Sequence, residues 1–171
     1  MYRHAYGFTL PELLIALSIL TLLASLGVPG LQQFIGGQQL VATSNMLTAT
    51  LAFARSESIK RRQPVLVDNG DNNWISGWKV YVDVNNNGQL DGGEPLLQQE
   101  GPLPSGIILK GNTPVRRYVR YTSLGNAKLL GGAFQAGTLT LCHASGTQAV
   151  RQLVLSASGR LRRERGEPGP C

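Results

Sequence analysis

An apolar run close to the N-terminus limits what this chain can fold into more than any other feature. From Phe8 to Val28 the sequence reads FTLPELLIALSILTLLASLGV, and Glu12 is the one charged residue in it. About 20 apolar residues are enough for a helix to cross the hydrocarbon core of a bilayer. No comparable run follows in the sequence, so we predict one membrane-spanning helix and a water-soluble region after it.

The position of Gly7 distinguishes this segment from an ordinary secretory signal. Such a signal carries its small-residue cleavage site after the apolar core, whereas Gly7 stands before it. Cleavage after Gly7 would leave the apolar segment in the mature chain as an anchor. Because a carboxylate at mid-bilayer costs about 2.5–3.5 kcal/mol, Glu12 needs a partner, and the new α-amino group of Phe8 has the right charge.

The remaining sequence predicts a longer helix and then a sheet. Residues 30–62 have apolar side chains near a 3.6-residue spacing, which predicts an amphipathic second half of the helix that Pro64 ends. Gly36 and Gly37 predict a bend or a local loss of helix within it. Short apolar runs between turn residues then favour antiparallel β-structure, so the fold class is α+β. The expected strands are Val65–Val67, Trp78–Val84, Leu96–Gln98, Ile107–Lys110, Arg117–Tyr121, Thr138–Cys142 and Gln152–Ser156.

Charge is distributed unevenly along the chain. Residues 63–109 carry one basic and six acidic side chains, or −5, whereas residues 110–171 carry ten basic and two acidic ones, or +8. A basic final third is typical of proteins with an anionic partner, and the alternative is that it serves solubility alone.

The two cysteines, Cys142 and Cys171, both lie in the last thirty residues. Together with the membrane segment they suggest an exported domain closed by one disulfide, and the alternative is two independent thiols.

The stretch from Gly7 to Leu14, GFTLPELL, resembles the processing motif of type IV pilins and type II secretion pseudopilins. This resemblance implies cleavage between Gly7 and Phe8 by a prepilin peptidase, methylation of the new amine, and a contact between Glu12 and the N-terminus of a neighbouring subunit. Pro11 departs from the commoner aliphatic residue, at little cost in a first helical turn.

Two later blocks resemble the GspH/FimT subgroup of minor pilins and pseudopilins. The first is GWKVYVD at residues 77–83 with the polar residues up to Leu97, and the second runs from Cys142 through GRLR at residues 159–162 to Cys171. The resemblance implies the type IV pilin fold, in which a long N-terminal helix packs on an antiparallel sheet. The implied divisions are a leader at 1–7, a transmembrane and assembly helix at 8–29, an amphipathic half-helix at 30–62 and a β-rich head at 63–171.

The polar block between two expected strands resembles a calcium-binding loop. Its oxygen-bearing residues match the template at alternating positions around Gly88, and the candidate ligands are Asp83, Asn85, Asn87, Asp91 and Glu94. Strands and not helices flank the block, and Asn and Gly also suit a hairpin turn. We interpret the block as a hairpin loop and keep calcium as the alternative.

Four arginines within six residues, Arg160, Arg162, Arg163 and Arg165, lie in a segment that we expect to be a flexible loop tied at Cys171. Guanidinium groups bind phosphates bidentately, and FimT-like proteins are associated with DNA uptake in natural transformation, so we predict DNA binding without base readout. The alternatives are a solvated face or pairing with acidic patches of other pilins. Further candidates, which sequence alone does not place on one face, are Arg116, Arg117, Arg120, Lys128 and Arg151.

No residue pattern supports catalysis. His143 directly follows Cys142, and adjacent strand residues point to opposite faces, so the two make a poor nucleophile–base pair. The resemblance to minor pilins implies a protein that is single-pass in the inner membrane with a periplasmic head, joins a pilus near its tip and contacts other pilins. Together with the arginine segment it implies DNA binding. The alternative is a type II secretion pseudopilin with a purely structural role.

Overall fold

The computed structural model describes residues 9–171, apart from the side chains of Leu26 and Pro29, and it divides into two compact units, Met1–Ile35 and Gly36–Cys171. Helix α1, Leu10–Arg61, contributes to both units. In the first unit every described residue from 9 to 35 is exposed. A window of α1 has a mean hydropathy of 2.1 and is long and apolar enough to cross a membrane. This segment therefore suits a membrane anchor for the globular second unit.

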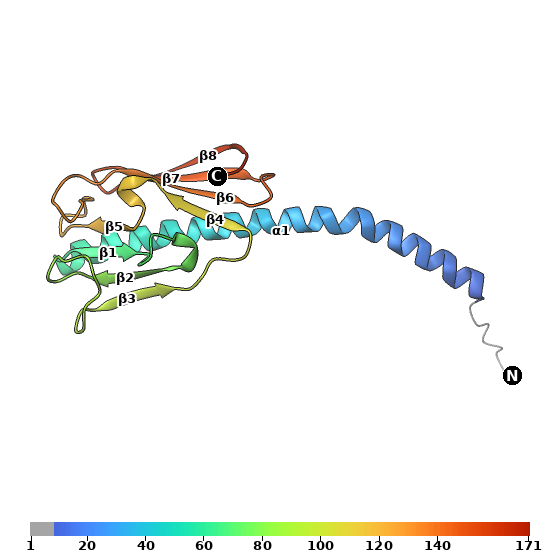
Figure 1. The fold of residues 1–171 in the computed structure, drawn as a ribbon, viewed down its shortest axis with the longest axis horizontal. Coiled ribbons are helices and arrows are strands. Elements are labelled where there is room, and N and C mark those ends of the chain that lie inside the picture. The colour runs from blue at the N-terminus through green and yellow to red at the C-terminus, as the bar shows by residue number, and fades with distance from the viewer. Residues whose placement is uncertain (1–8) are drawn as a thin grey trace. The chain divides into compact units, whose positions relative to one another are not determined.

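The second unit contains two four-stranded antiparallel sheets beside the second half of α1 (Figure 1). Sheet A has the order β3-β2-β1-β5, and sheet B has the order β4-β6-β7-β8. The strands of sheet A are β1 (Val65–Asp68), β2 (Trp78–Val82), β3 (Leu96–Glu100) and β5 (Tyr118–Tyr121). Those of sheet B are β4 (Ile107–Gly111), β6 (Gly137–His143), β7 (Ala149–Leu155) and β8 (Leu161–Pro168). Two short 3₁₀ helices, η1 (Trp74–Ser76) and η2 (Thr113–Val115), lie in the connections.

One hydrophobic core joins α1 to both sheets. The helix contributes Leu47 and Leu51, which are fully buried at every-fourth-residue spacing. Alternate residues of the strands meet them, such as Val80 in sheet A and Leu141 and Leu153 in sheet B. The predicted α+β class is confirmed. The amphipathic pattern makes α1 a core element from Leu40 onward, whereas Leu31, Phe34 and Ile35, at the start of the predicted amphipathic segment, are exposed.

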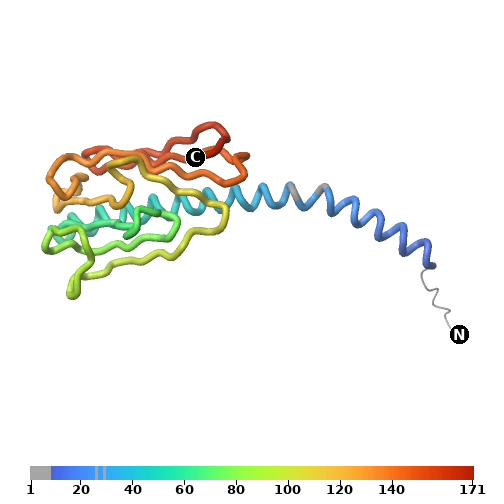
Figure 2. Tube along the Cα trace, viewed as in Figure 1, coloured from blue at the N-terminus to red at the C-terminus, as the bar shows by residue number. Residues whose placement is uncertain are grey.

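The structure of the C-terminal arginine segment contradicts the prediction from sequence. We expected a flexible loop there, whereas Leu161–Pro168 forms β8, the edge strand of sheet B, paired with β7. In Figure 2 this last segment, in red, runs back along its orange neighbour. The sequence did not predict a strand here because the segment is highly charged. An edge strand with both faces partly in water has no clear alternation of apolar and polar residues.

A local loss of helix at the glycine pair is not observed, because α1 remains helical through Gly36 and Gly37. A Cβ on Gly36 would lie 2.9 Å from Nε2 of His143, and one on Gly37 would lie 2.8 Å from Oε1 of Gln148. The pair therefore lets the β6–β7 connection approach the helix backbone closely, a use of glycine that a propensity argument does not detect.

Candidate functional site

The predicted processing residues Gly7 and Phe8 lie outside the described residues. Glu12 lies in the first turn of α1 and is exposed. Its carboxylate there is favourable with respect to the helix dipole, whose N-terminal end is positive. Pro11 is the second residue of α1, where its missing N–H leaves no intrahelical hydrogen bond broken.

The pairing of β8 with β7 decides which way its arginines point. Leu153 and Leu155 of β7 are buried in the core, so they mark the face of sheet B that is turned toward α1. Arg163 lies directly opposite Leu153 and shares that inner face. Arg162 lies opposite Val154 and therefore points to the outer face, where its Nη2 is 2.6 Å from Oε1 of Glu164.

Arg160 belongs to the turn between β7 and β8, and Arg55 of α1 holds this turn in place. Nε of Arg55 donates to the carbonyl of Gly125 at 2.8 Å, and its Nη2 donates to the carbonyl of Ser158 at 3.2 Å. Gly159 has φ of +77° at this point. Arg160 itself is exposed. Sequence reasoning missed Arg55, because nothing in the helical pattern marks a contact more than 100 residues away.

The other predicted DNA-binding arginines lie on sheet A or directly before it, and not on sheet B. Arg116 and Arg117 precede β5 and are exposed, and Nε of Arg117 is 3.5 Å from Oδ1 of Asp68. Arg120 within β5 is buried, and its Nη2 donates to Oδ1 of Asn86 at 2.5 Å. The structure therefore divides the seven predicted arginines between the two sheets and engages Arg120 in an internal contact.

The calcium-like block, residues 83–95, connects β2 to β3 as a hairpin loop. Asp83 is fully buried, and its Oδ1 accepts from the backbone N–H of Asn87 at 3.0 Å. Oδ2 of Asp91 accepts from the side-chain amides of Asn85 and Asn87 at 2.7 and 2.6 Å. These hydrogen bonds hold the pKa of the Asp91 carboxyl below its usual range.

Glu94 completes the same pattern. Its Oε1 accepts from the N–H of Val84 at 2.7 Å, and its Oε2 accepts from the N–H of Asp91 at 3.1 Å. The three candidate carboxylates are thus engaged by donors of the loop itself, which accounts for its shape as a hairpin without a cation. Across residues 9–171 no group of three or more His, Cys, Asp or Glu side chains is arranged to hold a metal ion.

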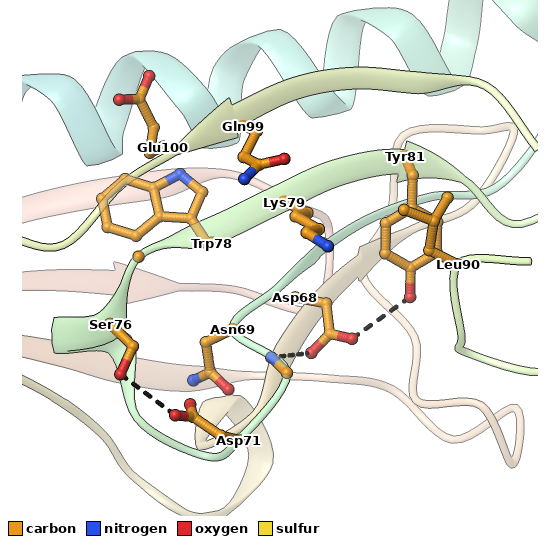
Figure 3. Close-up of a pocket in the computed structure, with 12 residues that line it drawn as sticks. Asp68, Asn69, Asp71, Ser76, Trp78, Lys79, Tyr81, Leu90, Gln99 and Glu100 are labelled. Carbon is orange, nitrogen blue, oxygen red and sulfur yellow. Dashed lines mark hydrogen bonds between the residues drawn. The ribbon is translucent and has the colours of Figure 1, made fainter.

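An acidic cavity of about 390 Å³ opens beside β1, β2 and β3 (Figure 3). Asp68 lies at its centre and accepts from the hydroxyl of Tyr81 at 3.4 Å, in addition to its contact with Arg117. Asp71 accepts from the hydroxyl of Ser76 at 3.1 Å. Burial raises the pKa of Tyr81, so this hydroxyl stays protonated and able to donate. Asp68 and Asp71 therefore accept hydrogen bonds from hydroxyls of the cavity wall, whereas Nε1 of Trp78, which also lines the cavity, is buried without a hydrogen-bond partner.

A disulfide joins Cys142 to Cys171, with 5.7 Å between the Cα atoms. Cys142 is fully buried in β6, and the bond fastens the C-terminus to sheet B. His143, the last residue of β6, has Nδ1 at 2.8 Å from Oγ of Ser145. Because the neighbouring sulfur is in a disulfide, Cys142 and His143 do not form a nucleophile–base pair.

Comparisons with known proteins agree with this architecture. Residues 43–159 match the family model of the type II transport protein GspH, and residues 2–28 match that of the prokaryotic N-terminal methylation motif. The type IV minor pilin FimU of Pseudomonas aeruginosa aligns with a TM-score of 0.59 and 22% identity, covering 77% of this chain and 92% of the FimU chain. The minor pseudopilin EpsH from the type 2 secretion system of Vibrio cholerae aligns with a TM-score of 0.56 and 13% identity, covering 74% of this chain and 97% of the EpsH chain. No curated protein matches the chain. At these identities the two structures establish a shared fold.

Proposed function

Since this chain belongs to the GspH family, whose pilins and pseudopilins are structural proteins and not enzymes, we propose that it is a minor subunit of a type IV pilus. The predicted resemblance and the expected absence of catalysis are both confirmed by this membership. Pilins associate with other pilins, and the exposed apolar half of α1 is the part of this chain that suits such association. Its position near the pilus tip is part of the proposal.

Maturation would begin with cleavage between Gly7 and Phe8 by a prepilin peptidase and methylation of the new amine. Support comes from the match of residues 2–28 to the methylation motif and from the exposed Glu12 in the first turn of α1. The anchor would hold the protein in the inner membrane, with its head in the periplasm, until assembly. Mass spectrometry of the purified chain tests this step, which requires the loss of residues 1–7 and the gain of one methyl group.

We further propose that the head binds DNA, independently of sequence, through the basic edge of sheet B. The observation that carries this proposal is that β8 is an edge strand with exposed arginines at 162, 163 and 165, preceded by the exposed Arg160. Residues 160–168 contain four arginines and two glutamates, a net charge of +2. Arg116 and Arg117 are also exposed and are secondary candidates, whereas the buried Arg120 is left out.

A binding titration with duplex DNA across salt concentrations tests DNA binding. If four or five phosphates are engaged, log K falls against log salt with a slope of about −4. The double variant Arg160→Ala, Arg162→Ala should flatten this slope, and Gln99→Leu on the opposite sheet should leave it unchanged. Failure of the unaltered chain to bind DNA at low salt would refute the proposal.

The second candidate function is that of a structural pseudopilin in type II secretion. The alignment with EpsH favours it about as strongly as the FimU alignment favours a pilus, because the two TM-scores are similar. Deletion of the gene separates them. Loss of DNA uptake with normal secretion supports the pilus, and loss of protein secretion with normal DNA uptake supports the secretion system.

A further inference from the structure

Three arginines share the inner face of sheet B at its free edge. Arg151 of β7 lies directly opposite Arg165 of β8, one row away from the pair formed by Leu153 and Arg163. Because residues two apart in a strand point to the same side, Arg151 shares the face of the buried Leu153. We call Arg151, Arg163 and Arg165 the inner arginine cluster.

In the described part of the chain, no carboxylate is paired with this cluster. Among residues 9–171, none of its three arginines forms an ion pair, and the one acidic residue between them in β8, Glu164, is paired with Arg162 on the outer face. Like charges directly opposite each other in a sheet are destabilising. Nε of Arg151 is in addition buried without a hydrogen-bond partner, and a buried donor without a partner also costs stability.

The cluster is accessible from the side of the sheet edge. Arg163 and Arg165 are exposed, and Arg151 is half-buried. Nη1 of Arg163 reaches toward α1 and donates to Oδ1 of Asn45 at 3.4 Å. A ligand approaching between β8 and α1 would therefore meet three guanidinium groups on two adjacent rows of the sheet.

We infer that the inner arginine cluster is an anion-binding site for the phosphodiester backbone of DNA, an assignment that rests on the DNA-binding function proposed above. Three guanidinium groups on two adjacent rows of one face favour a ligand with several closely spaced negative charges, which a phosphate backbone supplies. Each planar guanidinium group can bind one phosphate through two hydrogen bonds. Arg151 and Arg165 then carry more of the binding than Arg162, whose charge Glu164 already offsets.

The test uses the full chain in a nonionic detergent and a mixed-sequence duplex of about 20 base pairs. Arg151→Gln and Arg165→Gln keep much of the side-chain stem and remove the charge. Each should flatten the slope of log K against log salt by about 0.9. Between about 50 and 200 mM salt the double variant should therefore lose about 12-fold less affinity than the unaltered chain. Arg162→Gln, on the outer face of the same strand, should change the slope less than either. Lys79→Gln, which removes an exposed charge from sheet A, is the control and should leave the slope unchanged.

Other outcomes overturn the inference in distinguishable ways. If the double variant keeps the original affinity and slope while Arg160→Gln with Arg162→Gln loses them, DNA binding stands and the cluster is not its site. If the unaltered chain binds poly-L-glutamate and not DNA, the cluster takes an acidic protein segment and the assignment to phosphodiesters fails. If it binds neither DNA nor inorganic tripolyphosphate, both the inference and the proposed function fail. Thermal unfolding of each variant shows that it is folded, and relief of like-charge repulsion predicts unchanged or higher midpoints at low salt.

Discussion

The side chain of Gln135 closes the free edge of sheet A, and its replacement is the sharpest test of how the head is held together. Gln135 is fully buried. Its Oε1 accepts from the backbone N–H of Arg120 at 2.9 Å, and its Nε2 donates to the carbonyls of Tyr118 at 2.8 Å and Pro114 at 2.7 Å. Two of these groups belong to β5, so the amide takes the place that a further strand would occupy.

Gln135→Leu keeps a similar volume and removes all three hydrogen bonds. Each buried group that is left without a partner costs about 1–3 kcal/mol. Taking the lower part of that range for each group, and allowing a small gain from the apolar side chain, we expect a loss of about 3–4 kcal/mol in the free energy of unfolding. With a urea slope of about 2 kcal/mol per molar, the unfolding midpoint should fall by about 1.5–2 M.

Urea unfolding of the full chain in detergent, followed by tryptophan fluorescence, measures this loss. The chain has two tryptophans, Trp74 and Trp78, and both are buried in the head. Trp74 donates from Nε1 to the carbonyl of Val115, the residue next to Pro114, whose carbonyl accepts from Gln135. The fluorescence of Trp74 therefore reports on the region that the replacement affects. Replacement of the exposed Gln99 of β3 by leucine (Gln99→Leu) is the matched control, with a change within about 0.5 kcal/mol. A loss below about 1 kcal/mol for Gln135→Leu, at an unchanged slope, would refute the reasoning.

Three further predictions use the same chain. Cys171→Ser opens a bond between residues 29 apart in sequence, so unfolding should become easier by about 3–4 kcal/mol, and chemical reduction of the unaltered chain should give the same urea midpoint. Gly159→Ala places a Cβ 2.1 Å from the carbonyl oxygen of Gly125 at a φ of +77°, so it should lower the free energy of unfolding in urea by more than about 1 kcal/mol. Gly169→Ala, whose Cβ would have no atom within 4 Å, is the control and should change this free energy little. Titration calorimetry with calcium at millimolar concentration should give no saturable heat, because Asp83, Asp91 and Glu94 accept hydrogen bonds from their own loop. A saturable heat would favour the calcium interpretation instead.

Much of the fold could be predicted because its signals are local. The apolar run from residue 8 and the 3.6-residue spacing after it predicted a helix to about residue 62, and α1 ends at Arg61. Seven strands were predicted within a few residues of their observed bounds, and six of them have apolar residues buried in the core. The strand β8 was missed because it lies at an exposed edge of sheet B. Its residues are mostly charged and do not alternate between apolar and polar.

The candidate site could be predicted only in part, because it depends on register. The sequence indicated the arginines from 160 to 165 and left Arg151 as one of several distant possibilities. Pairing with β7 then places Arg151 opposite Arg165 and puts Arg162 on the other face beside Glu164. A shift of one residue in this register would reverse both assignments, which no property of the isolated segment excludes.

The sequence by itself determined the long apolar segment at the N-terminus, the α+β class and the family, because length, hydropathy and a compact motif are properties of neighbouring residues. The tertiary structure alone decided which charges share a face, which buried donors lack partners and how Gln135 closes an open edge. These features join residues 15 to more than 100 positions apart, and only the packing of both sheets against α1 brings such residues together.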